Sequence, residues 1–282
     1  MRTHAIAYPL SWRIITAALI AISRGSLPVL LALVYFSSNP PIMPLMLVRA
    51  LVILSVTPGI AAWLIERAHA VTVELEGDTL FLHHPEWRVE IPCGAISRID
   101  PWAVPLPGSG FWLRLQGGRR FRYGLKLADP TGLLDALVVA GAPEQARAAL
   151  QHPMAAYAHA KHGGRPRRWY HVLGKFVGFA LVPTLPLFRV HQHIAYGGTF
   201  GQYYLIGLGA YLRTFAVYWG TLILYLVLYA ALWRGVAEAV AWGAAWVAPS
   251  HAARVRRAVE IGHRIAYYGG VPVLVSIRFL AR

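Results

Sequence analysis

The residues best suited to bind a metal ion in this sequence are two histidines on either side of one glutamine, His191-Gln192-His193. Imidazole nitrogens are common metal ligands, and two of them two residues apart can face one site in an extended loop. No cysteine or carboxylate lies nearby in the sequence to complete a coordination shell. We therefore favour polar anchoring at a membrane interface, with a metal site at His191 and His193 as the alternative.

Familiar catalytic motifs are missing from the sequence. It contains no phosphate-binding glycine loop, no His-Glu-x-x-His motif, no nucleophile elbow and no pair of carboxylates within one apolar stretch. The single cysteine, Cys93, excludes an intramolecular disulfide and a cysteine-rich metal or redox centre. We therefore predict no catalytic residue and no cofactor, and an enzyme is the less favoured class of protein.

Two arginines, Arg49 and Arg213, lie within or at the edge of apolar runs. A charged residue at that depth costs about 2.5–3.5 kcal/mol on insertion scales, so each arginine needs a carboxylate, a lipid phosphate or a backbone partner. Glu238 and Glu260 are the only acidic residues after residue 144. A pairing between Glu238 and an arginine is one prediction, and arginines that reach the phospholipid headgroups are the other.

Basic and glycine-bearing segments predict further contacts with lipid headgroups or partner proteins. A basic linker and a basic amphipathic helix at residues 251–264 suit the cytoplasmic membrane face. A polar break at residues 191–202 suits the external face. The predicted contact residues are Arg49, Arg165, Arg167, Arg168, Tyr196, Gly197, Gly198, Arg213, Arg254, Arg256 and Arg257. Residues 193–198 and 264–270 are alike in sequence, which reflects either chance or a pair of glycine-hinged helix breaks.

The elements that must position these residues are mostly membrane helices. Hydrophobic residues make up 57% of the 282 residues and charged residues only 14%, whereas soluble domains carry roughly 25% charged residues. The clearest predicted span is Thr214–Trp233, which has no charge. Residues 11–24 are too short for a complete span, and we expect them either to lie in the membrane interface or to form the first half of a broken span. A further span from Trp169 to Phe188 is predicted to be broken by Pro183 and Pro186.

The amino-terminal region is predicted to be a helical hairpin, with its turn at residues 37–41 and a kink at residues 57–59. Residues 1–65 carry four arginines and no acid, and residues 145–282 carry fifteen basic residues against two acidic ones. These arginines flank apolar runs, which indicates a topology signal and headgroup contacts rather than nucleic-acid binding. The positive-inside rule places the N-terminus and the acidic segment 66–144 in the cytoplasm.

Residues 71–140 form the only long segment whose composition suits water. Short alternating runs joined by turns at residues 76–78 and 116–118 predict a meander of antiparallel strands. The runs are VTVEL (71–75), TLFLHH (79–84), EWRVEI (86–91), AISRI (95–99), FWLRL (111–115) and RRFRYGL (119–125). A helix at residues 130–140, capped by Asp129, is predicted to close the sheet.

This strand pattern resembles the bacterial pleckstrin-homology-like domain of multi-pass membrane proteins. The resemblance covers roughly residues 10–140 and includes the step from Ile91-Pro92 to the strand that ends at Ile99. It implies an accessory, assembly or interaction role, and it supplies no active-site residue.

These features predict an α-helical multi-pass membrane protein with an inserted small cytoplasmic β-rich domain. The expected parts are a membrane hairpin (1–67), a β domain (68–142), a helical and basic linker (143–168) and a C-terminal membrane domain with two to three spans (169–282). The expected function is that of a non-enzymatic accessory, assembly or scaffolding subunit of a bacterial inner-membrane complex. Its expected partners are other membrane subunits and anionic phospholipid headgroups, without nucleic acid. The alternative is a transporter or membrane-embedded enzyme with a site near His191, His193 and Arg213.

Overall fold

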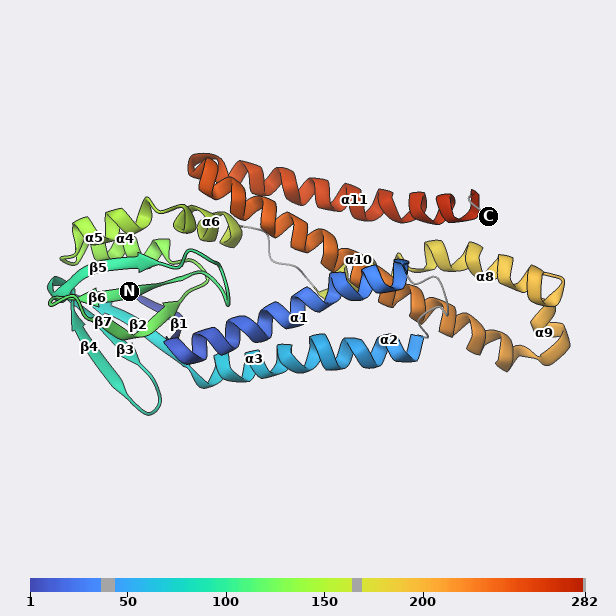
Figure 1. Ribbon diagram of the computed structural model, residues 1–282, viewed down its shortest axis with the longest axis horizontal. Helices are drawn as coiled ribbons and strands as arrows, with labels where there is room; N and C mark the ends of the chain where they lie inside the picture. The colour runs from blue at the N-terminus through green and yellow to red at the C-terminus, as the bar shows by residue number, and fades with distance from the viewer. Residues whose placement is uncertain (37–43, 164–168, 281–282) are drawn as a thin grey trace. The chain divides into compact units, whose positions relative to one another are not determined.

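The computed structural model describes residues 1–36, 44–163 and 169–280 (Figure 1). Contacts within the chain divide it into two compact units, which we call the sheet unit and the helical unit. The sheet unit consists of Met1–Ser26, Val52–Gly164 and Ala237–Glu260. The helical unit consists of Leu27–Leu51, Arg165–Val236 and Ile261–Arg282.

Four helical segments in the described part of the chain are long and apolar enough to cross a membrane. They are Leu10–Phe36, Pro44–Ala68, Trp169–Tyr196 and Leu208–Val247. The fold class of a mainly helical protein with a small antiparallel sheet and candidate membrane spans is therefore confirmed. The first of these segments corrects the prediction for residues 11–24, because the helix continues without interruption to Phe36.

The sheet unit is built on a seven-stranded antiparallel sheet with the order β4-β3-β2-β1-β7-β6-β5. The strands are β1 (Arg2–Pro9), β2 (Ala70–Glu76), β3 (Thr79–His83), β4 (Arg88–Pro92), β5 (Ile96–Pro101), β6 (Gly110–Leu115) and β7 (Arg120–Lys126). Strands β2 to β7 match the predicted runs. Strand β1 was not predicted, and it corrects the boundary between the hairpin and the β domain, because the first residues of the chain form the central strand.

The two faces of the sheet have different cores, because neighbouring residues of a strand point to opposite sides. Ala5 and Ala7 of β1 lie in the main core, together with Cys93 and with leucines of the closing helix. Tyr8 of the same strand packs instead with two tryptophans on the other face. The closing helix therefore lies on one face of the sheet, and the cluster around Tyr8 lies on the other.

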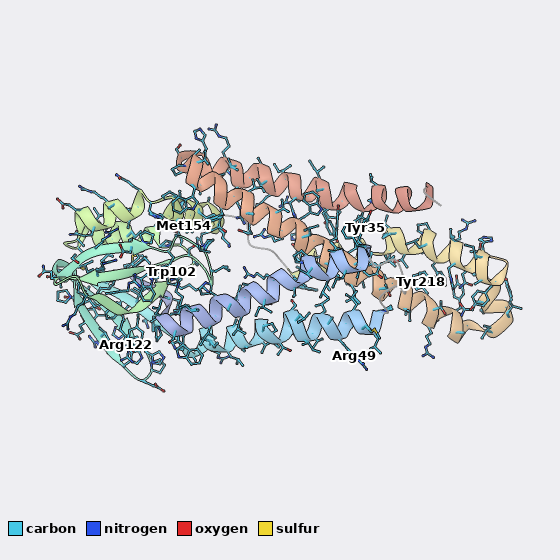
Figure 2. The ribbon with its side chains drawn as sticks, in the orientation of Figure 1. Tyr35, Arg49, Trp102, Arg122, Met154 and Tyr218 are labelled. Atoms are coloured by element: carbon cyan, nitrogen blue, oxygen red, sulfur yellow. The ribbon has the colours of Figure 1, made fainter. Side chains whose placement is uncertain are left out.

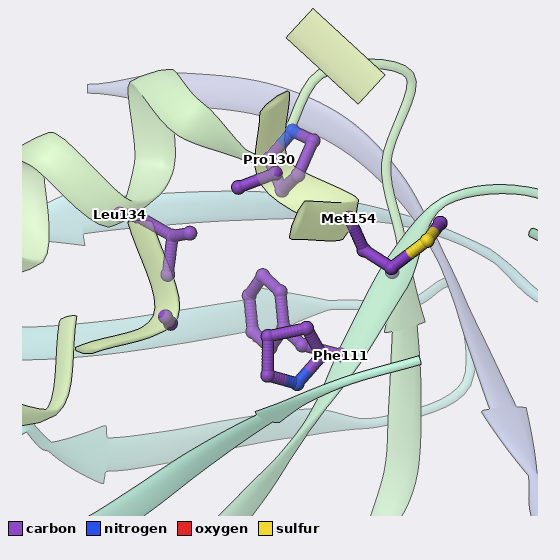
Figure 3. A pocket seen from close by; sticks show the side chains of 8 residues that line it. Phe111, Pro130, Leu134 and Met154 are labelled. Atoms are coloured by element: carbon purple, nitrogen blue, oxygen red, sulfur yellow. The ribbon is translucent and has the colours of Figure 1, made fainter. Parts of the chain in front are cut away.

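Two short helices, α4 (Thr131–Val139) and α5 (Pro143–Leu150), pack on the main-core face, and α6 (Pro153–His162) packs against both of them. The closing helix is thus confirmed as α4, and the Asp129 carboxylate accepts the Thr131 backbone N–H at 3.0 Å, as predicted for a cap. A cavity of about 10 Å³ lies between Phe111, Leu134 and Met154 (Figure 3). It has room for one water molecule, so this face is a packed core.

The hairpin runs through α1 (Leu10–Phe36), α2 (Pro44–Leu51), a π-helical turn (Val52–Val56) and α3 (Thr57–Ala68). The predicted kink at residues 57–59 directly follows this π turn, and Pro58 has no N–H to bond the Leu54 carbonyl. Side chains of α1 bond two carbonyl groups of this turn: Ser26 Oγ donates to Leu54 O at 3.2 Å, and Ser23 Oγ donates to Ser55 O at 2.7 Å. The predicted turn at residues 37–41 lies outside the described residues.

The helical unit contains most of the remaining helices: α7 (Trp169–Leu173), a π-helical turn (Gly174–Gly178), α8 (Leu181–Tyr196), α9 (Gly201–Ile206) and α10 (Leu208–Val247). The predicted break at Pro183 and Pro186 is wrong, because α8 continues through both. Pro183 lies in the first turn, where its missing N–H has no intrahelical partner to lose. Pro186 removes one hydrogen bond from a helix of sixteen residues.

Two long helices pass from one unit into the other. Helix α10 has 40 residues and is about 60 Å long, twice the thickness of a bilayer core. Helix α11 (Ala252–Leu280) carries the basic segment and continues through Gly269 and Gly270. The second predicted glycine break is therefore absent. The first predicted glycine break, at residues 193–198, is present, since Gly197 ends α8 with a φ of 73°.

Candidate functional site at the junction of sheet and hairpin

The sheet is joined to the helical hairpin without a linker. Strand β1 ends at Pro9 and α1 begins with the next residue, while a single residue, His69, separates α3 from β2. The Ala7 N–H donates to the His69 carbonyl at 2.9 Å, and Lys126 of β7 pairs with Glu66 of α3 at 2.5 Å. Backbone and side-chain bonds therefore fix the hairpin ends to the centre of the sheet.

A cluster of large aromatic residues fills the angle between α1 and the sheet. Tyr8, Trp102 and Trp112 are buried there, and Trp102 is labelled in Figure 2. The Arg13 guanidinium lies 4.1 Å from the centroid of the Trp102 ring. Gly124 provides the space, because a Cβ at this position would lie 3.0 Å from both indoles. Burial and the nearby Glu66 carboxylate raise the pKa of the Tyr8 hydroxyl above its usual range.

An open pocket of about 330 Å³ lies at the same end of the sheet. We call it the aromatic pocket; its lining residues are Pro9, Ala68, His69, His84, Glu86, Trp87 and Tyr123. The rings of His84 and Trp87 are stacked with centroids 5.0 Å apart, and those of Trp87 and Tyr123 with centroids 4.8 Å apart. Three aromatic rings from β7 and the β3–β4 turn therefore form one wall.

Hydrogen bonds fix the orientation of both histidines in this pocket. His84 Nδ1 accepts the Glu86 backbone N–H at 3.2 Å, so its proton is on Nε2, which donates to the Ala68 carbonyl at 3.0 Å. His69 Nδ1 donates to the Ile65 carbonyl at 3.0 Å. Both rings thus tie the pocket wall to the last turn of α3.

A second polar cluster in the sheet unit joins α6, α10 and α11. Arg256 of α11 makes two bonds to Glu238 of α10, at 2.8 and 2.9 Å, and one to Glu260 at 3.1 Å. Tyr157 of α6 donates to Glu238 at 2.6 Å, and Lys161 lies 3.5 Å from the same carboxylate. The predicted pairing of Glu238 with an arginine is confirmed, and its partner is Arg256.

This cluster corrects the prediction that Arg256 contacts lipid. The residue is only 5% exposed, and its charge is neutralised inside the protein. Burial by itself lowers the pKa of Arg256, but the bonds and charges of Glu238 and Glu260 outweigh burial and raise it. Burial also raises the pKa of Tyr157, and the adjacent Glu238 raises it further. The arrangement has the chemistry of a structural ion pair.

No protein-family model, no curated protein and no solved structure matches this chain.

The structure separates the two histidines predicted as metal ligands. Both lie on helix α8, where residues two apart project to different sides, so the extended loop assumed for a shared site is absent. His193 Nε2 lies 3.0 Å from the Thr199 hydroxyl, and the His191 ring lies 5.0 Å from that of Tyr218. Over residues 1–36, 44–163 and 169–280, no three His, Cys, Asp or Glu residues gather as a metal site.

The predicted external break closes on itself. Gln192 is completely buried, and its amide bonds both the side chain and the backbone N–H of Gln202, at 2.9 and 3.2 Å. Gln202 in turn donates to the Thr214 hydroxyl at 2.9 Å. The polar groups of this turn thus bond within the chain, while Tyr196, Gly197 and Gly198 form its half-buried or exposed outer part.

The remaining predicted contact residues either lie on the surface or fall outside the residues that the structure describes. Arg49, labelled in Figure 2, is exposed on α2, and Arg213 is exposed on α10. Arg254 and Arg257 are exposed on α11. Arg165, Arg167 and Arg168 lie outside the described residues.

A further cluster in the helical unit was missed by the sequence reasoning. Lys175 lies in the π turn of the third candidate span, with Nζ 3.5 Å from His263 Nε2 and 4.1 Å from the centroid of the Tyr267 ring. The Tyr267 hydroxyl donates to the Lys175 carbonyl at 3.0 Å, and Trp219 Nε1 donates to the Val177 carbonyl. The sequence does contain one signal for this cluster, because Lys175 is a charged residue within an apolar run and such residues need a polar partner.

Proposed function

We propose that this protein is a non-enzymatic accessory or scaffolding subunit of a bacterial inner-membrane complex, and that it presents its sheet unit to partner subunits. The observation that carries the proposal is the insertion of the hairpin between β1 and β2. Because the hairpin leaves the sheet at Pro9 and returns at Ala70 without a linker, the sheet is held at a fixed place on the membrane surface. A fixed surface favours binding of other membrane subunits, since little orientational freedom is lost on docking.

The sheet unit also supports the proposed topology. Paired strands lie on one side of the membrane, so the chain crosses an even number of times between β1 and β2. The end of α10 and the start of α11 pack against α6 in the same unit, so the chain again crosses an even number of times between α6 and residue 237. Four spans, with the N-terminus and the sheet in the cytoplasm, satisfy both conditions. A seven-stranded antiparallel sheet closed by a helix also fits the proposed pleckstrin-homology-like domain.

Photo-cross-linking in native membranes tests the proposal. A benzophenone amino acid at Val139, which is 88% exposed on the sheet unit, should give an adduct with one protein that also co-purifies in fixed stoichiometry. A double variant, His191→Ala with His193→Ala, should keep that partner, because neither histidine belongs to the sheet unit. A protein purified alone, with no adduct from position 139, contradicts the accessory role.

A second candidate function, a transporter, is favoured by Lys175. Ionisable residues within membrane spans often line a pathway for ions or solutes, and π turns recur at functional sites. The site near His191, His193 and Arg213 does not share this support, because the two histidines make separate contacts. Solute uptake that depends on Lys175, measured in proteoliposomes of the protein alone, favours transport. A partner that is retained in Lys175→Met favours the accessory role.

A further inference from the structure

We propose that the aromatic pocket binds the ammonium group of an aminophospholipid, of the phosphatidylethanolamine type, from the surrounding membrane. This inference is independent of the accessory role. The first observation is charge. Glu86 lines the pocket, and its carboxylate makes no ion pair within the part of the chain that the structure describes. The lining contains no lysine or arginine, so the pocket suits a cation and disfavours a phosphate.

The second observation is the wall of stacked rings. His84, Trp87 and Tyr123 line the pocket together with Glu86, and their rings are stacked on one another. The electron-rich face of an aromatic ring attracts an ammonium group, by about 0.5–1 kcal/mol where solvent has access and more where it does not. A pocket lined by aromatic rings and an acidic residue is therefore suited to an organic cation.

The third observation is position. Pro9 and Ala68 line the pocket, and they adjoin the ends of the first two candidate spans. Trp12 and Trp63, near the same ends, are 41% and 54% exposed, as expected for tryptophans at the level of the headgroups. At that depth, a lipid supplies the ammonium group at high local concentration, and this favours a lipid over a lysine of a partner protein or a soluble amine.

The pocket has the size for this ligand. A volume of about 330 Å³ lies at the lower end of the range for small-molecule sites, which is roughly 300–1,000 Å³. The pocket is open to the outside, so a headgroup can enter while its acyl chains stay in the bilayer.

Native mass spectrometry of the full-length protein in detergent measures the binding of short-chain lipids. The probes are dihexanoyl phosphatidylethanolamine, the same lipid with an N-acetylated amine, and O-phosphoethanolamine without acyl chains. The unmodified lipid should occupy one saturable site and bind about tenfold more tightly than the acetylated lipid, because acetylation removes the positive charge. O-phosphoethanolamine should bind weakly, since it lacks the apolar part that the membrane-proximal site would contact.

Two variants locate the site. Glu86→Gln should lower the affinity for the unmodified lipid to that for the acetylated one. Glu90→Gln is the matched control, because Glu90 is exposed on neighbouring β4 and pairs with Arg88 outside the pocket. Trp87→Leu should also weaken binding. The reactivity of Cys93 toward a thiol reagent reports whether each variant keeps its sheet folded, since this cysteine is completely buried.

Several results overturn the proposal. If Glu86→Gln binds the unmodified lipid as tightly as wild type does, the carboxylate does not bind the ammonium group. If the acetylated lipid binds as tightly as the unmodified lipid, the pocket does not recognise the positive charge. O-phosphoethanolamine that binds as tightly as the lipid shows a site for soluble amines. Binding of a lysine peptide but not of the lipid shows a site for a protein partner. None of these results depends on whether a subunit partner is found.

Discussion

The central position of β1 predicts that a charge at Ala7 destabilises the whole sheet. Ala7 is completely buried in the main core, and its strand bonds both β2 and β7. In Ala7→Asp, the carboxyl group is buried without a designed partner, which costs roughly 2–7 kcal/mol even when it is protonated. The larger side chain adds about 1–3 kcal/mol through overpacking. A total of at least about 3 kcal/mol raises the equilibrium constant for opening by about a hundredfold or more.

Cys93 provides the assay, because it is the only cysteine of the chain and is completely buried in the same core. Burial also raises the pKa of its thiol, so the native state reacts slowly with a thiol reagent and the reaction reports opening of the sheet. Labelling of purified Ala7→Asp should be about a hundredfold faster than that of wild type. His4→Asp is the control, since His4 is exposed on the same strand. Equal labelling rates for the two variants refute a buried, central β1.

Three further predictions concern the rest of the sheet unit. Arg256→Met should lower the free energy of unfolding by up to about 3–5 kcal/mol, because Arg256 is buried and its bonds to the partly buried Glu238 and to Glu260 are all lost. Arg257→Met, at an exposed position, should change it by less than about 0.5 kcal/mol in the same thermal denaturation series. Burial opposes the ionised form of Asp129, but bonds from Thr131 and His159 outweigh burial and lower the pKa of its carboxyl group below 3.8. Asp129→Asn should therefore lower the free energy of unfolding at pH 7, and this loss should shrink as the pH falls through the lowered pKa. A cost that is constant between pH 7 and pH 2.5 contradicts this cause. Gly124→Ala should cost about 1–3 kcal/mol by pushing a methyl group against the two indoles, and an unchanged melting temperature would show that the cluster is loosely packed.

The sequence predicted β2 to β7 and α4 well because their signals are local. Alternating apolar residues, glycine turns and a capping aspartate act within a few residues of each other. The run Arg2–Pro9 alternates too, but its inward residues Ala5 and Ala7 are small and have weak strand propensity. Its partners begin more than sixty residues later, at Ala70, so no local signal shows that the strand is central.

Errors in the candidate sites arose where the fold decides which groups meet. A short spacing of His191 and His193 indicates a common site only in an extended chain, and two prolines wrongly suggested that the helix had ended. Arg256 has the same sequence neighbourhood as the exposed Arg254 and Arg257, and only the position of Glu238 on another helix shows that it is buried. The aromatic pocket likewise joins residues from both ends of the hairpin with the β3–β4 turn.

In the proposed topology, the insertion of the hairpin between β1 and β2 makes the biogenesis of this protein depend on a correct number of membrane crossings. During synthesis β1 emerges first and then waits while the hairpin enters the membrane, because neither β2 nor β7 has yet been made. A hairpin that crosses once instead of twice leaves β1 on the opposite side from both partners. The other six strands then lack their central member, and β2 and β7 expose unpaired inner edges, a form prone to aggregation. These exposed strand edges would mark a misinserted chain as unfolded and make it a substrate for proteases.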